Sequence, residues 1–258
     1  MIAKETLHKF IIASVIIVGV SLLAYLLRDD KKNLASIDAA GSANVQKEDN
    51  LKKAEDKPSI DIKSATSQYV LVNKTYAIEP VDYKPGDLVI PDVQTSSSDS
   101  TDEQSVRKIV KPNIEKMLSD AKDAKLDLVM NSGFRSYKSQ GVYFNNYVKQ
   151  SGLEAAKKFS AEPGHSEHQT GLAFDLSYRD RHCYLDICFG QTDAGKWLAE
   201  HAHEYGFILR YLDGKTDVTG YQYEPWHFRY VGRDVAKEIF EQKLTYEEYL
   251  KNKGLIAN

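Results

Sequence analysis

The sequence SEHQTGLAFD, residues 166–175, predicts a loop that runs directly into a buried strand. His168 and Asp175 lie seven positions apart, a spacing that a helix would place on one face. Gly171 argues against a helix, because glycine is unfavourable in a helix interior. Asp175 instead alternates with apolar neighbours, so it should face the opposite side of a strand from them. A carboxylate in that position needs a partner, and a metal ion would serve.

A second polar stretch, EPWH, occupies residues 224–227. Because Pro225 follows Glu224, the glutamate should be extended or turn-like rather than helical. The stretch therefore differs from the helical His-Glu-x-x-His arrangement, in which both histidines lie on one helix face. We expect Glu224 and His227 to enter a site from neighbouring positions at the edge of a strand.

Together the two stretches offer what a catalytic zinc ion requires. Such an ion needs three protein ligands, an open position for water and a nearby base. His168, Asp175 and His227 would be the ligands, and one zinc ion would bind per chain. Glu224 would take the proton of the attacking water. These assignments predict a hydrolase.

Each of these residues also has a simpler structural explanation when it is taken alone. His168 would more often be a hydrogen-bonded structural histidine, and Asp175 would cap or pair. Glu224 would form a surface salt bridge. His165 is the nearest rival ligand, and the remaining histidines are expected to be structural or exposed: His8, His182, His201 and His203. The joint pattern, rather than any single residue, carries the prediction.

The composition is ordinary for a globular protein and excludes one class of partner. The 258 residues are enough for one sizeable domain or two small ones. Charged residues make up 28%, hydrophobic ones 42%, and the net charge is -3. Nucleic-acid binding would show as a basic face or stripe, so we expect no nucleic-acid partner. We expect a monomer.

Residues 1–27 predict an N-terminal membrane anchor. Residues 10–27 form an uninterrupted apolar run, and as a helix with a rise of about 1.5 Å per residue they would reach roughly 27 Å, close to the bilayer thickness. Basic residues before the run predict that the N-terminus stays in the cytoplasm. A cleaved signal peptide is the alternative, with its nearest cleavage site around residues 39–43. We favour an uncleaved, single-pass anchor that places the remaining chain outside the cytoplasm.

The region between the anchor and the folded domain predicts a flexible linker. Residues 28–68 contain no aromatic side chain and are rich in Lys, Asp, Ala and Ser. Such a segment buries too little apolar surface to offset its ordering entropy. We therefore place the folded domain at residues 69–258.

Within this domain the hydrophobic patterns predict strands and helices in mixed order. We expect strands at residues 69–72, 87–90, 126–130, 172–176, 207–211 and 226–230. We expect helices at residues 106–121, 139–150, 192–205, 233–242 and 245–251. Pro112 should kink the first helix or mark the first turn of another. The order lacks βαβ periodicity and favours an α+β fold.

Cys183 and Cys188 are the only cysteines. In an oxidising compartment they would form a small local disulfide, which is the interpretation we favour. A metal site is the weaker alternative, because two thiolates need two further ligands and only His182 is adjacent. Free thiols are the third possibility.

The full set of motifs resembles the VanY-type zinc D-Ala carboxypeptidases. The pattern Ser-x-His-x-x-Gly-x-Ala-x-Asp followed by Glu-Pro-Trp-His carries this likeness, which extends over residues 69–240. Further shared segments are residues 132–136, 163–166, 205–207 and 220–232. This family acts on bacterial peptidoglycan and includes D,D- and L,D-carboxypeptidases. The resemblance implies a small, mainly antiparallel sheet flanked by helices, as in the hedgehog and D,D-peptidase zinc fold.

The resemblance also implies roles for individual residues. It assigns zinc binding to the same three ligands and the general base to Glu224. Arg135 matches the arginine that holds the substrate's carbonyl or carboxylate and steadies the oxyanion. Gln140 and Ser166 match positions that line the substrate pocket. Taken alone, Arg135 would form a structural salt bridge, and the Ser166 hydroxyl would cap a loop.

These assignments predict a membrane-tethered zinc peptidase at the bacterial cell wall. It would remove the C-terminal D-Ala of peptidoglycan stem peptides as a D,D-carboxypeptidase. The alternatives are L,D-carboxypeptidase action on tetrapeptides, an endopeptidase with a cleft open at both ends, or a non-catalytic zinc-binding wall module. Glu224 argues against the last, because a structural zinc ion needs no base.

Overall fold

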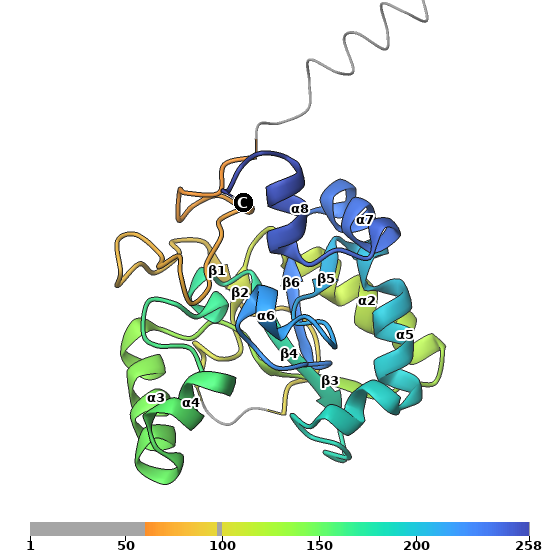
Figure 1. Ribbon diagram of the computed structural model, residues 1–258. Coiled ribbons are helices and arrows are strands. Elements are labelled where there is room, and N and C mark those ends of the chain that lie inside the picture. Colours follow the sequence, from red (N-terminus) through yellow and green to blue (C-terminus); the bar gives the residue numbers. More distant parts are fainter. Residues whose placement is uncertain (1–59, 97–99, 258) are drawn as a thin grey trace, which may run out of the picture. The chain divides into compact units, whose positions relative to one another are not determined.

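A computed structural model describes residues 60–96 and 100–257 of the chain (Figure 1). These residues belong to one compact unit that begins at Ile60. The predicted anchor at residues 10–27 lies outside the described residues, as does the predicted linker up to residue 59. Among the described helices, none combines the length and apolar character needed to span a bilayer.

The folded unit starts earlier than the sequence indicated. Residues 60–68, which we expected in the linker, pack against the domain. Ile60 and Ile62 contact the buried cluster formed around the C-terminal helices. The Leu71 amide donates to the Ile62 carbonyl at 2.9 Å, and an Arg107 guanidinium donates to the Thr66 carbonyl at 2.7 Å. These apolar side chains and paired carbonyls offset the ordering entropy of the segment.

A four-stranded antiparallel sheet forms the centre of the domain. Its order is β3 (Leu128–Ser132), β4 (Ala173–Tyr178), β6 (His227–Tyr230) and β5 (Phe207–Leu209). A separate two-stranded sheet pairs β1 (Leu88–Val89) with β2 (Val106–Arg107). Helices flank the central sheet, which confirms the predicted α+β class.

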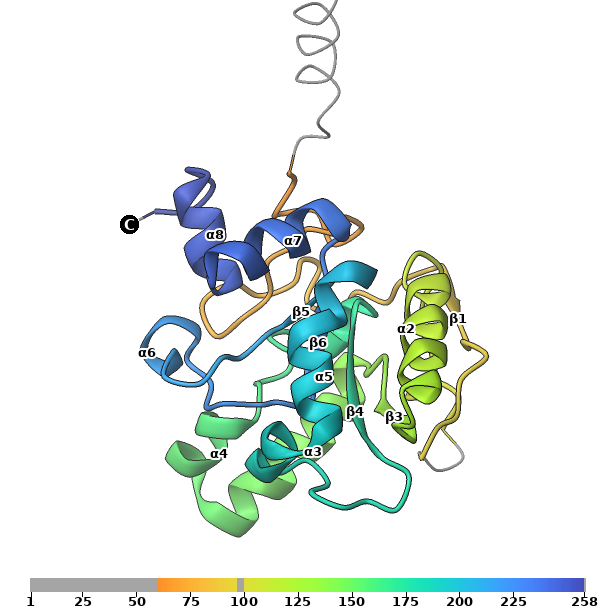
Figure 2. The same ribbon diagram turned by 90° about the vertical axis from the view of Figure 1, so that its right-hand side faces the viewer.

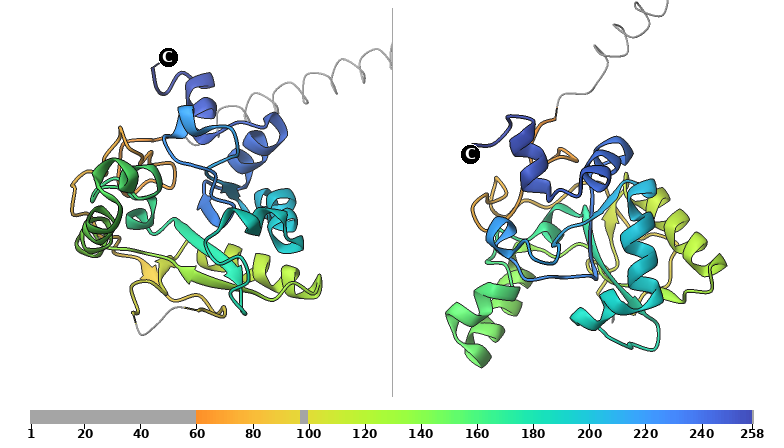
Figure 3. Two further views of the ribbon diagram at one scale, coloured as in Figure 1. Left: turned by 60° about the horizontal axis from the view of Figure 1, so that its bottom comes forward. Right: turned by 45° about the vertical axis from the view of Figure 1, so that its right-hand side comes forward.

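The helices group on two sides of this sheet. One group contains α2 (Lys111–Asp123), α5 (Asp193–His201) and α7 (Arg233–Gln242), each of which contacts the short helix η3 (Ala202–Tyr205) (Figure 2). The pair α3 (Tyr137–Ser151) and α4 (Leu153–Phe159) lies apart from that group (Figures 1 and 3). The remaining helical elements are η1 (Glu167–Thr170), η2 (Ile187–Gln191), α6 (Thr216–Thr219) and α8 (Tyr246–Asn252).

The main core packs the apolar face of β4, β5 and β6 against α2 and α5. Phe174, Phe207 and Phe228 are completely buried, and the rings of Phe174 and Phe207 meet edge to face at 5.0 Å. Ile114 from α2 and Leu198 from α5 belong to the same buried cluster. Because apolar residues alternate with polar ones along β4 and β6, the opposite face of these strands is free to carry polar side chains.

Two predicted elements differ from the structure. Residues 69–72 are not a strand, because the buried Arg229 guanidinium binds the carbonyls of Gln68 and Val70 that a neighbouring strand would need. The helix predicted from residue 106 begins at Lys111, after strand β2. Pro112 lies in its first turn, where proline's missing N–H costs no helix hydrogen bond.

Candidate metal centre and substrate cleft

Three buried side chains converge at one end of the central sheet. His168 comes from η1, Asp175 from β4 and His227 from the first position of β6. One nitrogen or oxygen of each lies within 4.8 Å of the others. The antiparallel register pairs Asp175 directly with His227. Gly171 adopts a left-handed φ of +65° after η1 and brings His168 back over the start of β4.

Each imidazole has one nitrogen held by the protein and the other directed at Asp175. His168 Nδ1 lies 2.8 Å from the Gly133 carbonyl oxygen, so this nitrogen carries the proton and Nε2 is free. His168 Nε2 lies 3.4 Å from Asp175 Oδ2, and His227 Nδ1 lies 3.2 Å from Asp175 Oδ1. Nitrogen atoms fixed in this way are typical of metal-binding histidines.

The three side chains fit a zinc ion. Asp175 Oδ1 is buried and accepts no hydrogen bond from the described residues. Burial opposes ionisation of Asp175, but the adjacent His168 and His227 outweigh it and hold its pKa well below the usual range. An ionised, incompletely paired carboxylate in the interior calls for a cation. Two imidazoles and one carboxylate are a ligand set that zinc prefers, and they leave a coordination position open.

Glu167 contacts the ring nitrogen of His227 that does not face Asp175, and the sequence motifs did not single it out. Its Oε2 lies 3.4 Å from His227 Nε2, which directs the other ring nitrogen toward Asp175. Its Oε1 accepts hydrogen bonds from Arg210 Nε and Arg229 Nη1, each at 2.8 Å. Burial disfavours the carboxylate, yet the two guanidinium groups keep the pKa of Glu167 far below its ordinary value. A lone glutamate has no spacing signal, because its arginine partners lie 43 and 62 positions away.

The buried ion pairs continue from Glu167 to the C-terminal helix. Arg210 also donates two hydrogen bonds to Glu247 of α8, at 2.8 and 2.6 Å. Glu247 Oε1 accepts a further bond from Asn73 Nδ2 at 3.0 Å. Two arginines and two glutamates therefore balance their charges in the interior. This network fixes the His227 ring relative to α8.

Glu224 lines the same cleft as the three ligands. It lies in the turn before β6, where its amide donates to the Tyr211 carbonyl at 3.1 Å and its carbonyl accepts from the His227 amide at 3.2 Å. Burial raises the pKa of its carboxyl to about 8. A cation held by the ligands would lower that pKa, because it stabilises the carboxylate. The structure thus brings the predicted base and the predicted ligands into one cleft.

Arg135 faces this cleft, which has a volume of about 230 Å³. Its Nη2 donates to Ser132 Oγ at 2.7 Å and its Nη1 to Gln140 Oε1 at 3.2 Å. The guanidinium lies 5.0 Å from the centre of the Tyr143 ring, and its buried Nε has no partner among the described residues. No described carboxylate pairs with Arg135, so a structural salt bridge does not explain it. Its charge is available to an anionic ligand.

Gln140 and Ser166 also line the cleft, in different ways. Gln140 accepts from Arg135 and donates from Nε2 to the Ala161 carbonyl at 2.7 Å. Its polar atoms are therefore already engaged, and it positions the guanidinium. The Ser166 hydroxyl makes no capping hydrogen bond to η1, so it is not the loop cap of the simpler explanation. His165, the rival ligand, instead contacts the Asn73 carbonyl through Nδ1 at 2.7 Å.

Comparison with known proteins identifies the family. The model of the family VanY, described as D-alanyl-D-alanine carboxypeptidase, matches residues 103–233. The chain belongs to the VanY family. It is 47% identical over 181 residues to YodJ of Bacillus subtilis (strain 168), and the match covers 70% of this chain and 66% of YodJ. It therefore spans just under two thirds of that relative's length.

Two solved structures share the fold of this VanY-family chain. The LdcB LD-carboxypeptidase, a structure that reveals the basis of peptidoglycan recognition, has a TM-score of 0.68 and 45% identity; the match covers 72% of this chain and 87% of LdcB. A mutant of the vancomycin resistance D,D-pentapeptidase VanY from the VanB-type cassette, in complex with Zn(II), has a TM-score of 0.58 and 29% identity. That match covers 70% of this chain and 97% of the VanY chain.

Tyr221 is a second cleft residue that the sequence did not single out. Its ring packs 4.5 Å from that of Tyr211, which in turn lies 4.9 Å from the His227 ring. The Tyr221 hydroxyl is buried and has no hydrogen-bond partner among the described residues. A buried hydroxyl without a partner is uncommon, so this one is available to a ligand in the cleft of this VanY-family protein.

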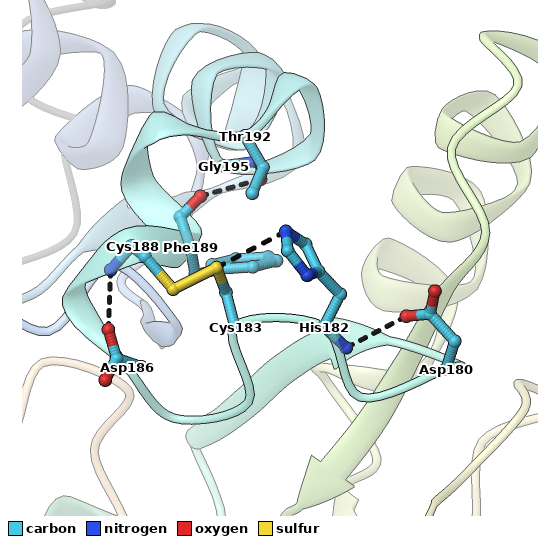
Figure 4. Close-up of a disulfide and its surroundings, with 8 residues drawn as sticks. All are labelled: Asp180, His182, Cys183, Asp186, Cys188, Phe189, Thr192 and Gly195. Carbon is cyan, nitrogen blue, oxygen red and sulfur yellow. Dashed lines mark hydrogen bonds between the residues drawn. A yellow bond between two sulfur atoms is a disulfide. The ribbon is translucent and has the colours of Figure 1, made fainter.

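Cys183 and Cys188 form a disulfide with a Cα–Cα distance of 5.5 Å (Figure 4). His182, the remaining ligand of the weaker metal alternative, lies 3.5 Å from Cys183 Sγ through Nε2. The disulfide closes the loop between β4 and η2. Leu185, inside this closed loop, reaches the lining of the VanY-family cleft.

Proposed function

We propose that this chain is a zinc carboxypeptidase that hydrolyses the C-terminal D-Ala of peptidoglycan stem peptides. The observation that carries the proposal is the convergence of His168, Asp175 and His227 in a cleft that also contains Glu224 and Arg135. Membership of a carboxypeptidase family supports the reaction type. The likeness to LdcB, which is described with peptidoglycan recognition, supports the substrate class.

The residues of the chain divide the reaction between them. Zinc, when bound, supplies Lewis-acid activation of water and of the scissile carbonyl. Glu224 accepts the proton of the attacking water as the new C–O bond forms. The same carboxyl returns that proton to the departing amine of D-Ala when the C–N bond breaks. Arg135 directs its guanidinium into the cleft, where it stabilises the oxyanion or holds a substrate carboxylate.

Two substrates fit this chemistry, and they differ in the residue that precedes the terminal D-Ala. A D,D-carboxypeptidase would cut pentapeptide stems, as the sequence motifs indicated and as the likeness to the D,D-pentapeptidase VanY supports. An L,D-carboxypeptidase would cut tetrapeptide stems. The second candidate is favoured by the greater likeness to the LdcB LD-carboxypeptidase, in both identity and TM-score.

The cellular location is part of the proposal. The apolar run at residues 10–27 would anchor the chain in the membrane, with the domain outside the cytoplasm at the cell wall. The disulfide between Cys183 and Cys188 supports an oxidising compartment.

The test uses the full-length, zinc-loaded protein with purified pentapeptide and tetrapeptide stems. Mass spectrometry should detect loss of one alanine from at least one of them, and a zinc chelator should abolish it. The peptide that is shortened identifies the D,D or L,D activity. If protein with a full complement of zinc shortened neither peptide, the proposed function would be wrong.

A further inference from the structure

The disulfide that closes the loop between β4 and η2 has contacts with the domain or the start of η2 at each of its two cysteines. Cys183 packs against the main core of the domain. Asp186 accepts a hydrogen bond from the Cys188 amide at 2.9 Å and caps the start of η2 (Figure 4). The segment from residue 183 to 188 therefore forms a short ring with little freedom to move relative to the sheet.

This ring holds a backbone conformation that its sequence disfavours. Cys183 and Leu185 in the ring have φ values of 53° and 47°, and Arg181, two residues before the ring, has a φ of 63°; none of them is glycine. L-residues rarely adopt this left-handed region, since Cβ approaches the backbone. Such residues persist where the surrounding structure over-determines them, and they cluster at ligand sites. Here the disulfide and the core contact of Cys183 supply the constraint.

The result of this conformation is the placement of Leu185 at the mouth of the substrate cleft. Leu185 lines the cleft and is 38% exposed, whereas the three metal ligands are at most 5% exposed. Tyr147 of α3 also lines the cleft and is 37% exposed. Its ring meets that of Phe159 of α4 edge to face at 5.2 Å.

Leu185 and the Tyr147–Phe159 pair come from separate parts of the chain, the loop after β4 and the helices α3 and α4, and all three line the same cleft. The pair α3 and α4 lies on one side of the domain, and the loop after β4 lies across from it (Figures 1 and 3). The buried His168, Asp175 and His227 line this cleft as well. A ligand that reached the metal centre and extended outward would meet lining residues that are more exposed than the three metal ligands, among them Leu185 and Tyr147.

We infer that the disulfide-closed loop is a substrate-binding wall, in which Leu185 contacts the part of the stem peptide that precedes the residues at the scissile bond. This inference rests on the proposed carboxypeptidase activity. An enzyme that removes a C-terminal residue binds that residue next to the catalytic groups, so the preceding chain leaves through the open mouth. The contact there is with aliphatic portions of the peptide, because the Leu185 side chain offers only apolar surface.

Two peptides that end in the same two residues separate this role from a structural one. One is a complete stem peptide, and the other is shortened to N-acetylated terminal residues that do not reach the mouth. For Leu185→Ala, the KM of the long peptide should rise about fivefold, as expected for lost apolar contact, with kcat unchanged. The short peptide should keep its KM. The double variant Cys183→Ser, Cys188→Ser should show the same length dependence.

Ile187→Ala is the matched control. Ile187 is a branched apolar residue two positions away, it is 59% exposed, and it does not line the cleft. The Ile187→Ala variant should have the wild-type KM for both the long and the short peptide. Zinc content and the thermal unfolding midpoint, measured for every variant, establish that the compared proteins are folded.

The outcomes distinguish this inference from the proposed function. If the wild-type protein released D-Ala from neither peptide, the proposed function would fail first. If it released D-Ala and Leu185→Ala left the KM of the long peptide unchanged, or raised both values equally, the inference would be overturned. Leu185→Ala decides this even where the cysteine variant fails to fold.

Discussion

The buried carboxylate of Glu167 offers a sharp test of how the metal centre is held. It accepts hydrogen bonds from Arg210 and Arg229, and it faces His227 Nε2 at 3.4 Å. Glu167→Gln preserves the shape of the side chain but removes its charge. Arg229 then loses the one carboxylate that pairs with it among the described residues. Arg210 keeps its pair with Glu247.

Two effects of Glu167→Gln can be given magnitudes. Loss of one partner from a buried ion pair costs about 3–5 kcal/mol of unfolding free energy, because a charge is left uncompensated. The two arginine donors hold the amide oxygen of the glutamine, so its NH2 group faces His227 Nε2 and the acceptor that orients this histidine is lost. Loss of such an acceptor weakens metal affinity by about 10–100-fold. The His227 ring remains able to ligate, so binding should be weakened rather than abolished.

Competition with a chromophoric chelator measures the zinc affinity, and urea unfolding of the zinc-free protein measures the stability. Glu162→Gln is the control, since Glu162 pairs with Lys157 at the surface, with both side chains more than 40% exposed. That change should leave zinc affinity at the wild-type value. Wild-type zinc affinity in folded Glu167→Gln would refute the reasoning that Glu167 orients His227.

Two further predictions follow from the cleft and from the network behind it. Arg135→Met should lower kcat/KM for D-Ala release by about 100–1,000-fold, as loss of an oxyanion donor does. The control Arg179→Met, which removes a surface partner of Asp127, should have no such effect in the same assay. Glu247→Gln should destabilise the zinc-free protein most near neutral pH. Burial opposes ionisation of Glu247, but Arg210 outweighs it and lowers the pKa of Glu247 below the ordinary glutamate value of 4.5. A carboxyl group with a lowered pKa in the folded state contributes stability above about pH 4.5. This contribution is lost as the pH falls further. Urea unfolding should therefore show that the difference in unfolding free energy between Glu247→Gln and wild type becomes smaller from pH 7 to pH 3. A difference that stayed constant over this range would contradict a stabilising ion pair between Glu247 and Arg210.

Much of the fold is readable because its elements carry strong periodic patterns. Helix α7 has the predicted bounds, Arg233–Gln242, and β6 begins within one residue of its expected start. The segment at residues 69–72 shows why other parts are not readable. Its apolar run resembles a strand, but the side chains of two residues more than 150 positions away bind its carbonyls, Arg229 that of Val70 and Tyr246 that of Tyr69. No local pattern encodes these contacts.

The site divides in the same way. His168, Asp175, Glu224 and His227 belong to short motifs whose residue types already match zinc chemistry. Glu167 and Tyr221 become visible only through tertiary contacts, one with two distant arginines and the other as an unpaired buried hydroxyl. Leu185 depends on a left-handed backbone that its amino-acid type does not suggest. Such positions follow from packing rather than from spacing.

The proposed mechanism requires Glu224 to transfer protons at a zinc centre whose ligands are other residues. Zinc content and D-Ala release, measured together on Glu224→Gln, test it most directly. We expect the variant to retain one zinc ion per chain and to release D-Ala at least about 100-fold more slowly than wild type. Release near the wild-type rate would contradict the role of Glu224 as the base, and loss of zinc would show that Glu224 is a ligand.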